Sequence, residues 1–328
     1  MTKILICGYG SIGKKHAQNL KTLGVDVSVW RNRPEASAEI KDDGFAFEPD
    51  LDKGLKWCDG VVVATSTDSH IFPASKAAKL GKAIYLEKPV SHNLDGLDEL
   101  LEISKGLVVE VGCQLRQYPN FKALKECLDS GKDGKILAFQ AWVGQRLDQW
   151  RPGTDYRECY SADASRGGGA LFDLVHEVDL MTWLVGPMES VYADLRQNSD
   201  LEMKAEDLAN LILVSCEGAA GTVQLDMLSP AYRRGLQVVC DRAVYRCDMQ
   251  EGVLWRSEGA GLPEKVSATP KKYAPPQMLY DAMANFIARV KKPDLPANCS
   301  LEEGVHDLKI LLSAREASAS GTRQMLES

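Results

Sequence analysis

The 328-residue chain lacks several features that would place it in a specialised class of protein. Its net charge is −7 and it has no basic block, which argues against a nucleic-acid partner. No apolar run is long enough to span a membrane, and the first residues lead directly into a predicted strand. We therefore expect no membrane segment and no signal peptide. Repeats and low-complexity segments are also absent, so the composition is that of an ordinary globular protein.

The nine cysteines are scattered, without CxxC or paired Cys/His spacing. This pattern predicts neither a disulfide framework nor a zinc site. Several of them, such as Cys7, Cys216 and Cys240, lie in apolar strand-like runs and are typical of inert core residues. We expect reduced thiols in a cytoplasmic protein, and no metal.

The most informative segment stands at the start of the chain, where Gly8, Gly10 and Gly13 follow the apolar run 4–6 at G-x-G-x-x-G spacing. A helical stretch and a second strand-like run, 25–30, come next and complete a β-α-β unit. In such a unit Gly8 permits the tight turn, Gly10 lets the backbone approach a pyrophosphate, and Gly13 lets the helix pack close to the strand.

This segment therefore predicts dinucleotide binding. We expect the intervening residues of the turn to line the same site, and these are Tyr9, Ser11 and Ile12.

Strands and helices alternate through the first part of the chain, which predicts a doubly wound parallel α/β sheet, a Rossmann fold. The pattern changes after about Pro119 to a long series of strands at hairpin-like spacing, followed by helices at 277–290 and 301–320. We expect a dinucleotide-binding domain over 1–119. Over 120–328 we expect an α+β substrate-binding and oligomerisation domain, with an open, mostly antiparallel sheet. The uncovered face of that sheet predicts a homodimer or homotetramer.

The end of the second strand bears on the choice of cofactor. An NAD site usually has Asp or Glu there, to accept a hydrogen bond from the ribose 2′-hydroxyl. Here the sequence reads Arg31-Asn32-Arg33, and an arginine could stack on adenine or pair with a 2′-phosphate. The segment favours NADP(H), with NAD(H) possible because some sites without the carboxylate still take it. Solvated loop arginines are the alternative.

Two clusters carry residues suited to proton transfer. Glu87-Lys88-Pro89 follows the predicted strand 83–86, at the sheet edge where doubly wound folds bind ligands. Lys88 could exchange a proton with a substrate hydroxyl. From these three residues alone, however, a surface Glu-Lys pair that closes a turn before the proline is the favoured interpretation. Gly167-Gly168-Gly169 precedes a predicted helix over 170–184, on which Asp173, His176 and Glu177 share a face. A solvated acidic stripe is the alternative there.

Taken together, the motifs resemble the Gfo/Idh/MocA oxidoreductases, the group of glucose-fructose oxidoreductase and inositol dehydrogenase. The resemblance spans essentially the whole chain. It rests on the glycine turn through His16, Ala64-Thr-Ser-Thr-Asp-Ser-His70, Glu87-Lys88-Pro89, the Gly167 segment with His176-x-x-Asp179, and Leu301-Glu-Glu-Gly304.

The resemblance also implies residue roles. Thr65, Ser66 and His70 would line the cofactor together with Glu87, Lys88 and Pro89, and Pro89 would follow a cis peptide bond. Lys88 matches the family's catalytic lysine and His176 the histidine that handles the substrate proton, with Asp173 as its partner. The family usually has Asp-x-x-x-His, whereas this chain has Asp173-x-x-His176, so Glu177 could share the role of Asp173.

The loop after Trp150 resembles a sub-branch often associated with bacterial surface-sugar synthesis. Its polar and aromatic side chains could contact an acidic or hydroxyl-rich substrate, or could simply pack within a structured loop. The predicted substrate-contacting residues are Arg151, Tyr156, Arg157 and Tyr160 of this loop, with Gln114, Arg116 and Glu177.

The expected activity is reversible hydride transfer between NADP(H), or NAD(H), and a secondary alcohol or ketone of a sugar, sugar derivative or cyclitol. A redox-neutral enzyme with a retained dinucleotide, of epimerase or glycosidase type, is one alternative. A non-catalytic NAD(P) sensor is the other.

Overall fold

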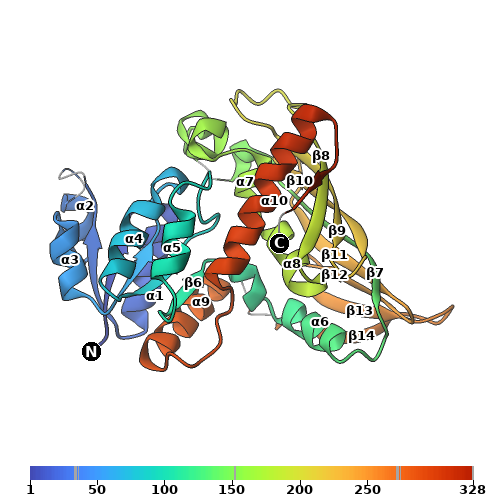
Figure 1. The fold of residues 1–328 in the computed structure, drawn as a ribbon, viewed down its shortest axis with the longest axis horizontal. Coiled ribbons are helices and arrows are strands. Elements are labelled where there is room, and N and C mark those ends of the chain that lie inside the picture. The colour runs from blue at the N-terminus through green and yellow to red at the C-terminus, as the bar shows by residue number, and fades with distance from the viewer. Residues whose placement is uncertain (33–34, 36, 151–152, 271–272, 274, 327–328) are drawn as a thin grey trace. The chain divides into compact units, whose positions relative to one another are not determined.

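The computed structural model describes residues 1–32, 35, 37–150, 153–270, 273 and 275–326. Its helices and strands divide into two compact units, shown in chain colours in Figure 1. The first comprises Met1–Gln114 and Ala274–Val305, and the second Leu115–Tyr273 and His306–Ser328. The chain passes from the first unit to the second after Gln114, whereas the predicted boundary is at residue 119. Residues 275–305 belong to the first unit.

The first unit is built on a parallel sheet. Among the described residues it has six strands in the order β3-β2-β1-β4-β5-β6. The strands are β1 Lys3–Cys7, β2 Asp26–Trp30, β3 Ala46–Glu48, β4 Gly60–Val63, β5 Ala83–Leu86 and β6 Val109–Val111. The connecting helices are α1 Ser11–Thr22, α2 Ser37–Asp42, α3 Leu51–Trp57, α4 Ile71–Lys79 and α5 Leu97–Ile103. The predicted Rossmann fold is therefore confirmed.

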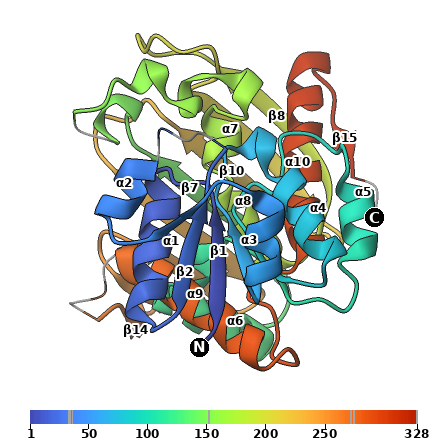
Figure 2. The same cartoon turned by 90° about the vertical axis from the view of Figure 1, so that its left-hand side faces the viewer.

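Helices cover both faces of this sheet, as the apolar strands require. Ile4 and Ile6 of β1 lie in a core cluster with Phe286 of α9 (Pro275–Lys291), which packs beside α1. Leu5 points the other way, toward Gly54 of α3. Figure 2 shows β1 and β2 between α1 and α3. This burial by α9 explains why a segment far along the chain belongs to the first unit.

The second unit has a sheet of nine described strands, in the order β14-β13-β12-β11-β7-β10-β9-β8-β15. The pair β7 and β10 is parallel and the others are antiparallel, so the mostly antiparallel sheet is confirmed. The strands are β7 Ile136–Gly144, β8 Met188–Arg196, β9 Leu208–Ser215, β10 Ala220–Asp226, β11 Arg233–Cys240, β12 Val244–Asp248, β13 Val253–Ser257, β14 Glu264–Ala268 and β15 Gln324–Met325. The helices are α6 Pro119–Asp129, α7 Ala170–Asp173, α8 His176–Val185 and α10 Leu301–Ser320, which begins in the first unit.

One face of this sheet carries the helices and the other is open. Along β9, buried Ala209, Leu211 and Leu213 alternate with exposed Asn210 and Ile212. Because side chains alternate across a strand, the exposed residues form the outer face. That face combines polar and apolar side chains.

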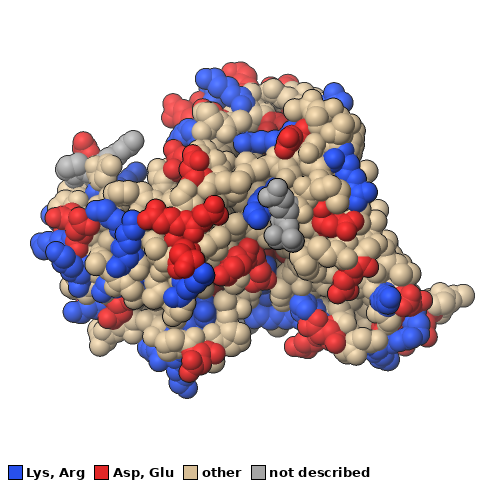
Figure 3. Space-filling view, in the orientation of Figure 1, with Lys and Arg blue, Asp and Glu red and all other residues tan. Residues whose placement is uncertain are grey.

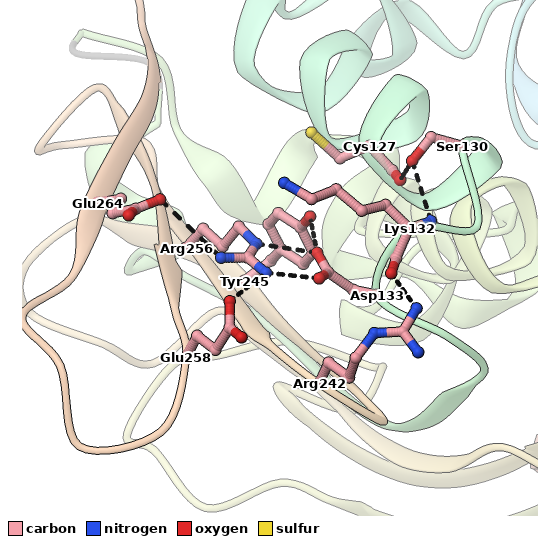
Figure 4. A network of polar contacts seen from close by, with 9 residues as sticks. All are labelled: Cys127, Ser130, Lys132, Asp133, Arg242, Tyr245, Arg256, Glu258 and Glu264. Atoms are coloured by element: carbon pink, nitrogen blue, oxygen red, sulfur yellow. Dashed lines mark hydrogen bonds and ion pairs between the residues drawn. The ribbon is translucent and has the colours of Figure 1, made fainter.

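A network of polar contacts ties one end of this sheet to the loop after α6 (Figure 4). Asp133, buried in that loop, accepts hydrogen bonds from Arg256 of β13 and from the Tyr245 hydroxyl of β12 at 2.5 Å each. The hydrogen bond from Arg256 holds the pKa of Asp133 below its usual range. These contacts fix three segments that are distant in the sequence.

Charge is distributed without a dominant sign on the face shown in Figure 3, where acidic and basic side chains are interspersed. Within the described part of the chain, no helix is both long and apolar enough to cross a membrane.

Candidate functional site

The glycine turn between β1 and α1 forms a cradle with room for a ligand. Gly8 has φ +101°, and a Cβ there would lie 2.5 Å from the carbonyl oxygen of Ala64. A Cβ on Gly13 would lie 2.3 Å from the carbonyl oxygen of Gly8. At Gly10, by contrast, a Cβ would meet no described atom within 4 Å, so the backbone faces open space. The first N–H groups of α1 are therefore accessible to a pyrophosphate, and these residues fit a dinucleotide.

Arg31 and Asn32 follow β2, as expected, and Arg33 lies outside the described residues. The guanidinium of Arg31 lies 4.0 Å from the carboxylate of Glu39, which also accepts a hydrogen bond from Lys14. Glu39 belongs to α2 and was not predicted, because no strand-end pattern marks a carboxylate on the following helix. The predicted ribose site therefore has both basic side chains, Arg31 and Lys14, and an acidic one, Glu39, at its edge.

Tyr9 is buried beside this edge. Its hydroxyl donates to Asp43 at 2.8 Å, and its side chain packs against Phe45. Burial, followed by the hydrogen bond to Asp43, raises the pKa of Tyr9. Tyr9 thereby connects the glycine turn to the loop after α2.

The segment after β4 contains Thr65, Ser66 and His70. The hydroxyl oxygen of Thr65 is buried and has no hydrogen-bond partner among the described residues, as suits a position that awaits a ligand. His70 is buried, with Nδ1 3.0 Å from the carbonyl oxygen of Pro89 and Nε2 3.2 Å from that of Thr65. Burial lowers its pKa. His70 therefore joins the segment after β4 to the segment after β5.

Glu87, Lys88 and Pro89 stand at the carboxyl end of β5, and the bond between Lys88 and Pro89 is cis. Glu87 is buried, and its Oε1 lies 2.7 Å from Nε2 of His16 on α1. Sequence reasoning missed this role for His16, since a histidine on an apolar helix face gives no sign of its partner.

In the second unit, the expected helix over 170–184 is two helices. A turn at Leu174 separates α7 from α8, so Asp173 ends one helix and His176 begins the next. Asp173 and His176 therefore do not share a face of one helix, and that prediction is wrong. Both side chains are nevertheless buried. The Tyr160 hydroxyl donates to Oδ1 of Asp173 at 2.6 Å.

The glycine-rich segment explains how Tyr160 reaches this place. A Cβ on Gly168 would lie 2.1 Å from the carbonyl oxygen of Tyr160, so only glycine lets the two backbone segments pack so closely. Glu206 accepts a hydrogen bond from the backbone N–H of Leu171 at 3.1 Å, at the start of α7. Burial raises the pKa of Glu206.

The other predicted polar residues around α8 have specific partners. Glu177 forms an ion pair with Arg234 of β11 at 2.7 Å, and both side chains are largely buried. Asp179 accepts from Nε and Nη2 of Arg116 at 3.0 and 2.6 Å. Arg116 is 1% exposed, so its guanidinium is enclosed beside Asp179.

The side chains of the predicted substrate loop contact residues of the loop itself and of the segment at Glu202. The Tyr156 hydroxyl accepts from the backbone N–H of Glu202 at 3.0 Å, and Arg157 pairs with Asp155 at 2.7 Å. Gln114 begins a short 3₁₀ turn after β6. Arg151 lies outside the described residues.

A Rossmann sheet with a glycine cradle, joined in one chain to an open-sheet unit that carries a buried histidine, defines a class of dinucleotide-dependent oxidoreductase. Residues 2–113 match the family model described as "Oxidoreductase family, NAD-binding Rossmann fold". Residues 121–246 match "GFO/IDH/MocA C-terminal domain". The chain belongs to the Gfo/Idh/MocA family of NAD-binding oxidoreductases, as its motifs predict.

Known relatives include a myo-inositol 2-dehydrogenase from Thermotoga maritima, 29% identical over 235 residues, with 67% of each chain covered. Among solved structures, a levoglucosan dehydrogenase in complex with NADH and levoglucosan has a TM-score of 0.87 and 17% identity, covering 100% of this chain and 99% of that one. The WlbA dehydrogenase from Bordetella pertussis, in complex with NADH and UDP-GlcNAcA, has a TM-score of 0.80 and 22% identity, with the same coverage. These structural likenesses show the shared fold.

Proposed function

We propose that the protein transfers a hydride between a nicotinamide dinucleotide and a secondary alcohol or ketone of a sugar, sugar derivative or cyclitol. The observation that carries the proposal is the open cradle at Gly10, on the same sheet edge as Lys88. Support for the substrate class comes from relatives whose names specify inositol and levoglucosan.

In the oxidative direction, the imidazole of His176 accepts the proton of the substrate hydroxyl, because histidine changes charge near neutral pH. The ammonium group of Lys88 stabilises the negative charge that develops on the same oxygen. A dinucleotide held at the glycine turn of Gly8, Gly10 and Gly13 would supply the acceptor for the hydride of the substrate carbon. In the reductive direction His176 returns the proton.

Asp173 is the better choice as the group that orients His176. Glu177 is adjacent to His176 on α8, so their side chains diverge, and its carboxylate is engaged by Arg234. Asp173 is held in place by Tyr160. Tyr160 therefore belongs to the same polar assembly, in which it fixes the carboxylate.

Replacing Lys88 by Met tests the mechanism. We expect kcat to fall by a factor of about 10²–10⁴, because one positioned proton-transfer or charge-stabilising group is lost. The dissociation constant for the dinucleotide, measured by calorimetry, should change less than about twofold. The assay requires a first screen of cyclitols, sugars and sugar nucleotides for a change in reduced nicotinamide.

Lys79→Met is the matched control, since Lys79 is an exposed residue of α4 that pairs with Glu99. Normal turnover by Lys88→Met would contradict the assigned role. A dinucleotide that co-purifies, with substrate conversion but no net change in reduced nicotinamide, would instead indicate the redox-neutral alternative.

For the cofactor, NADP(H) is our choice over NAD(H), supported by Arg31 and Asn32 at the end of β2. A 2′-phosphate would compete with Glu39 for the guanidinium of Arg31. We expect Arg31→Ala to weaken NADPH binding by about ten- to a hundredfold, the value of a charge-assisted hydrogen bond, and to leave NADH binding unchanged. Calorimetry with both cofactors measures this. A preference for NADH that the substitution does not alter would overturn the choice.

The proposed assembly is a homodimer or homotetramer formed through the outer face of the second unit's sheet. Exposed apolar side chains on that face, including Ile212 and Tyr192, support this interface. The cytoplasm is the proposed compartment, on the basis of the cysteine pattern.

A further inference from the structure

Two buried histidines of the first unit hold the residues on either side of Lys88. His16 of α1 contacts Glu87, with 2.7 Å between Nε2 and Oε1. His70 has its Nδ1 3.0 Å from the carbonyl oxygen of Pro89. Both imidazoles are buried, at 0% and 2% exposure. The histidines therefore hold the side chain of the residue before the lysine and the backbone carbonyl of the residue after it.

The carboxylate of Glu87 transmits the first of these contacts to Lys88 itself. Its second oxygen, Oε2, accepts a hydrogen bond from the backbone N–H of Lys88 at 3.3 Å. On its other side the carboxylate packs against Gly112, where a Cβ would lie 3.0 Å from both oxygens. The contacts with His16, with the Lys88 N–H and with Gly112 together restrict the carboxylate, and the restricted carboxylate holds the Lys88 backbone.

The contacts of His16 also determine its tautomer. Its Nδ1 is buried and has no hydrogen-bond partner in the described part of the chain. A proton on Nδ1 would therefore be buried without an acceptor, which costs the desolvation of a donor. The favoured form carries its proton on Nε2 and donates it to Glu87. The ring is kept in this orientation by edge-to-face packing on Tyr85, with 5.4 Å between centroids.

We propose that His16, acting through Glu87, is a positioning residue that fixes Lys88 for its step in the reaction. This inference rests on the proposed function, in which Lys88 acts on the substrate oxygen. A buried polar pair contributes little to folding compared with a well-packed apolar pair, because burying the charge costs desolvation. Its directional hydrogen bonds are suited to orientation.

The test compares two substitutions at His16. In His16→Leu the donor is lost while a buried side chain is kept, and we expect kcat to fall at least tenfold. The substrate KM and the dinucleotide dissociation constant should stay within about twofold. In His16→Gln a side-chain amide reaches about as far as Nε2 and still donates, so kcat should recover to within about threefold of the wild type.

Leu20→Ala is the control for a merely structural effect, since Leu20 lies on the same buried face of α1 and has no part in this pair. It should lower the melting temperature without lowering kcat. The inference is overturned if His16→Leu keeps kcat within twofold, if its loss of kcat is matched by loss of dinucleotide affinity, or if His16→Gln fails to restore turnover.

A second measurement separates this inference from the proposed function. If Lys88→Met turns over normally, the proposed function fails whatever happens at His16. Independently of turnover, ¹⁵N NMR of histidine-labelled protein reads the tautomer, and the chain has only five histidines to assign. We expect His16 protonated at Nε2 in the wild type, with that proton's hydrogen bond lost in Glu87→Ala. Protonation of His16 at Nδ1 alone would overturn the inference.

Discussion

Three carboxylates of α7 and α8 have identifiable polar contacts with side chains of other segments. Tyr160 donates to Asp173, Arg234 pairs with Glu177, and Arg116 with Asp179. In a buried setting such contacts are stronger than at the surface, because water does not compete for them. Asp173, Glu177 and Asp179, which lie near His176 in the sequence, are therefore each held by a specific contact.

Removing the Tyr160 hydroxyl should lower turnover without unfolding the protein. In Tyr160→Phe the carboxylate of Asp173 loses a 2.6 Å hydrogen bond, and we expect kcat to fall about ten- to a hundredfold. Steady-state kinetics measure the loss, with circular dichroism to verify the fold. Tyr245→Phe is the matched control, since that hydroxyl donates to the carboxylate of Asp133 at 2.5 Å and has no assigned role in the reaction. Equal effects of the two substitutions on kcat would show that a general loss of stability, and not the contact with Asp173, is responsible.

At the scale of elements, α8 and α10 are joined by buried acidic groups. Asp307 of α10 accepts from the Thr182 hydroxyl at 2.9 Å, close to the ion pair of Asp179 with Arg116. Burial, followed by the charge of Asp179, raises the pKa of Asp307 well above its usual range. One positive guanidinium thus compensates Asp179, and Asp307 keeps its proton to a higher pH than a solvent-exposed aspartate does.

This arrangement predicts a pH dependence of stability. In the unfolded state Asp307 releases its proton at about pH 4, whereas in the folded state it releases it only at a higher pH. Between these two pH values the unfolded state binds fewer protons than the folded state. The free energy of unfolding therefore falls as pH rises, by up to about 1.4 kcal/mol per pH unit from this residue. Asp307→Asn should remove that slope and become more stable than the wild type toward neutral pH.

Urea unfolding at several pH values measures this difference. Asp194→Asn serves as the control, because Asp194 is partly exposed and pairs with Arg196. If the free energies of unfolding of Asp307→Asn and the wild type change in parallel between about pH 4 and neutral pH, the raised pKa of Asp307 is contradicted.

At the scale of the whole molecule, the outer face of the second unit's sheet exposes apolar side chains. Among the described residues, no helix covers the exposed side chains of β8 and β9 on that face. Tyr192 of β8 is paired in register with Ile212 of β9, and the two are 39% and 50% exposed. Exposed apolar side chains side by side on a broad sheet favour self-association.

Ile212→Asp should therefore dissociate the proposed homo-oligomer, because it would bury a carboxylate in the proposed interface. Light scattering after size-exclusion chromatography measures the mass. Leu262→Asp makes the same kind of change at a 92% exposed position in the segment before β14 and should leave the proposed homo-oligomer intact. An unchanged mass for Ile212→Asp, or a wild-type monomer, would rule out this interface.

The sequence by itself determined the Rossmann fold, the mostly antiparallel second sheet and the family. These follow from local signals in the sequence. Apolar residues either alternate with polar ones or run continuously in the strands, glycines stand where the backbone turns tightly, and the family's motifs occur in a fixed order. It failed to predict α2 and α3, since residues 31–60 are polar and the helices short. Only the N-cap Asp50, which accepts from two backbone N–H groups, signals α3.

Tertiary structure alone decided which side chains meet. The contacts of His16 with Glu87, Tyr160 with Asp173 and Arg116 with Asp179 join residues that are 71, 13 and 63 positions apart. No local pattern encodes such a pair, because it depends on how strands and loops are brought together by burial of apolar surface elsewhere. The turn that separates Asp173 from His176 and the return of α9 to the first unit were decided in the same way.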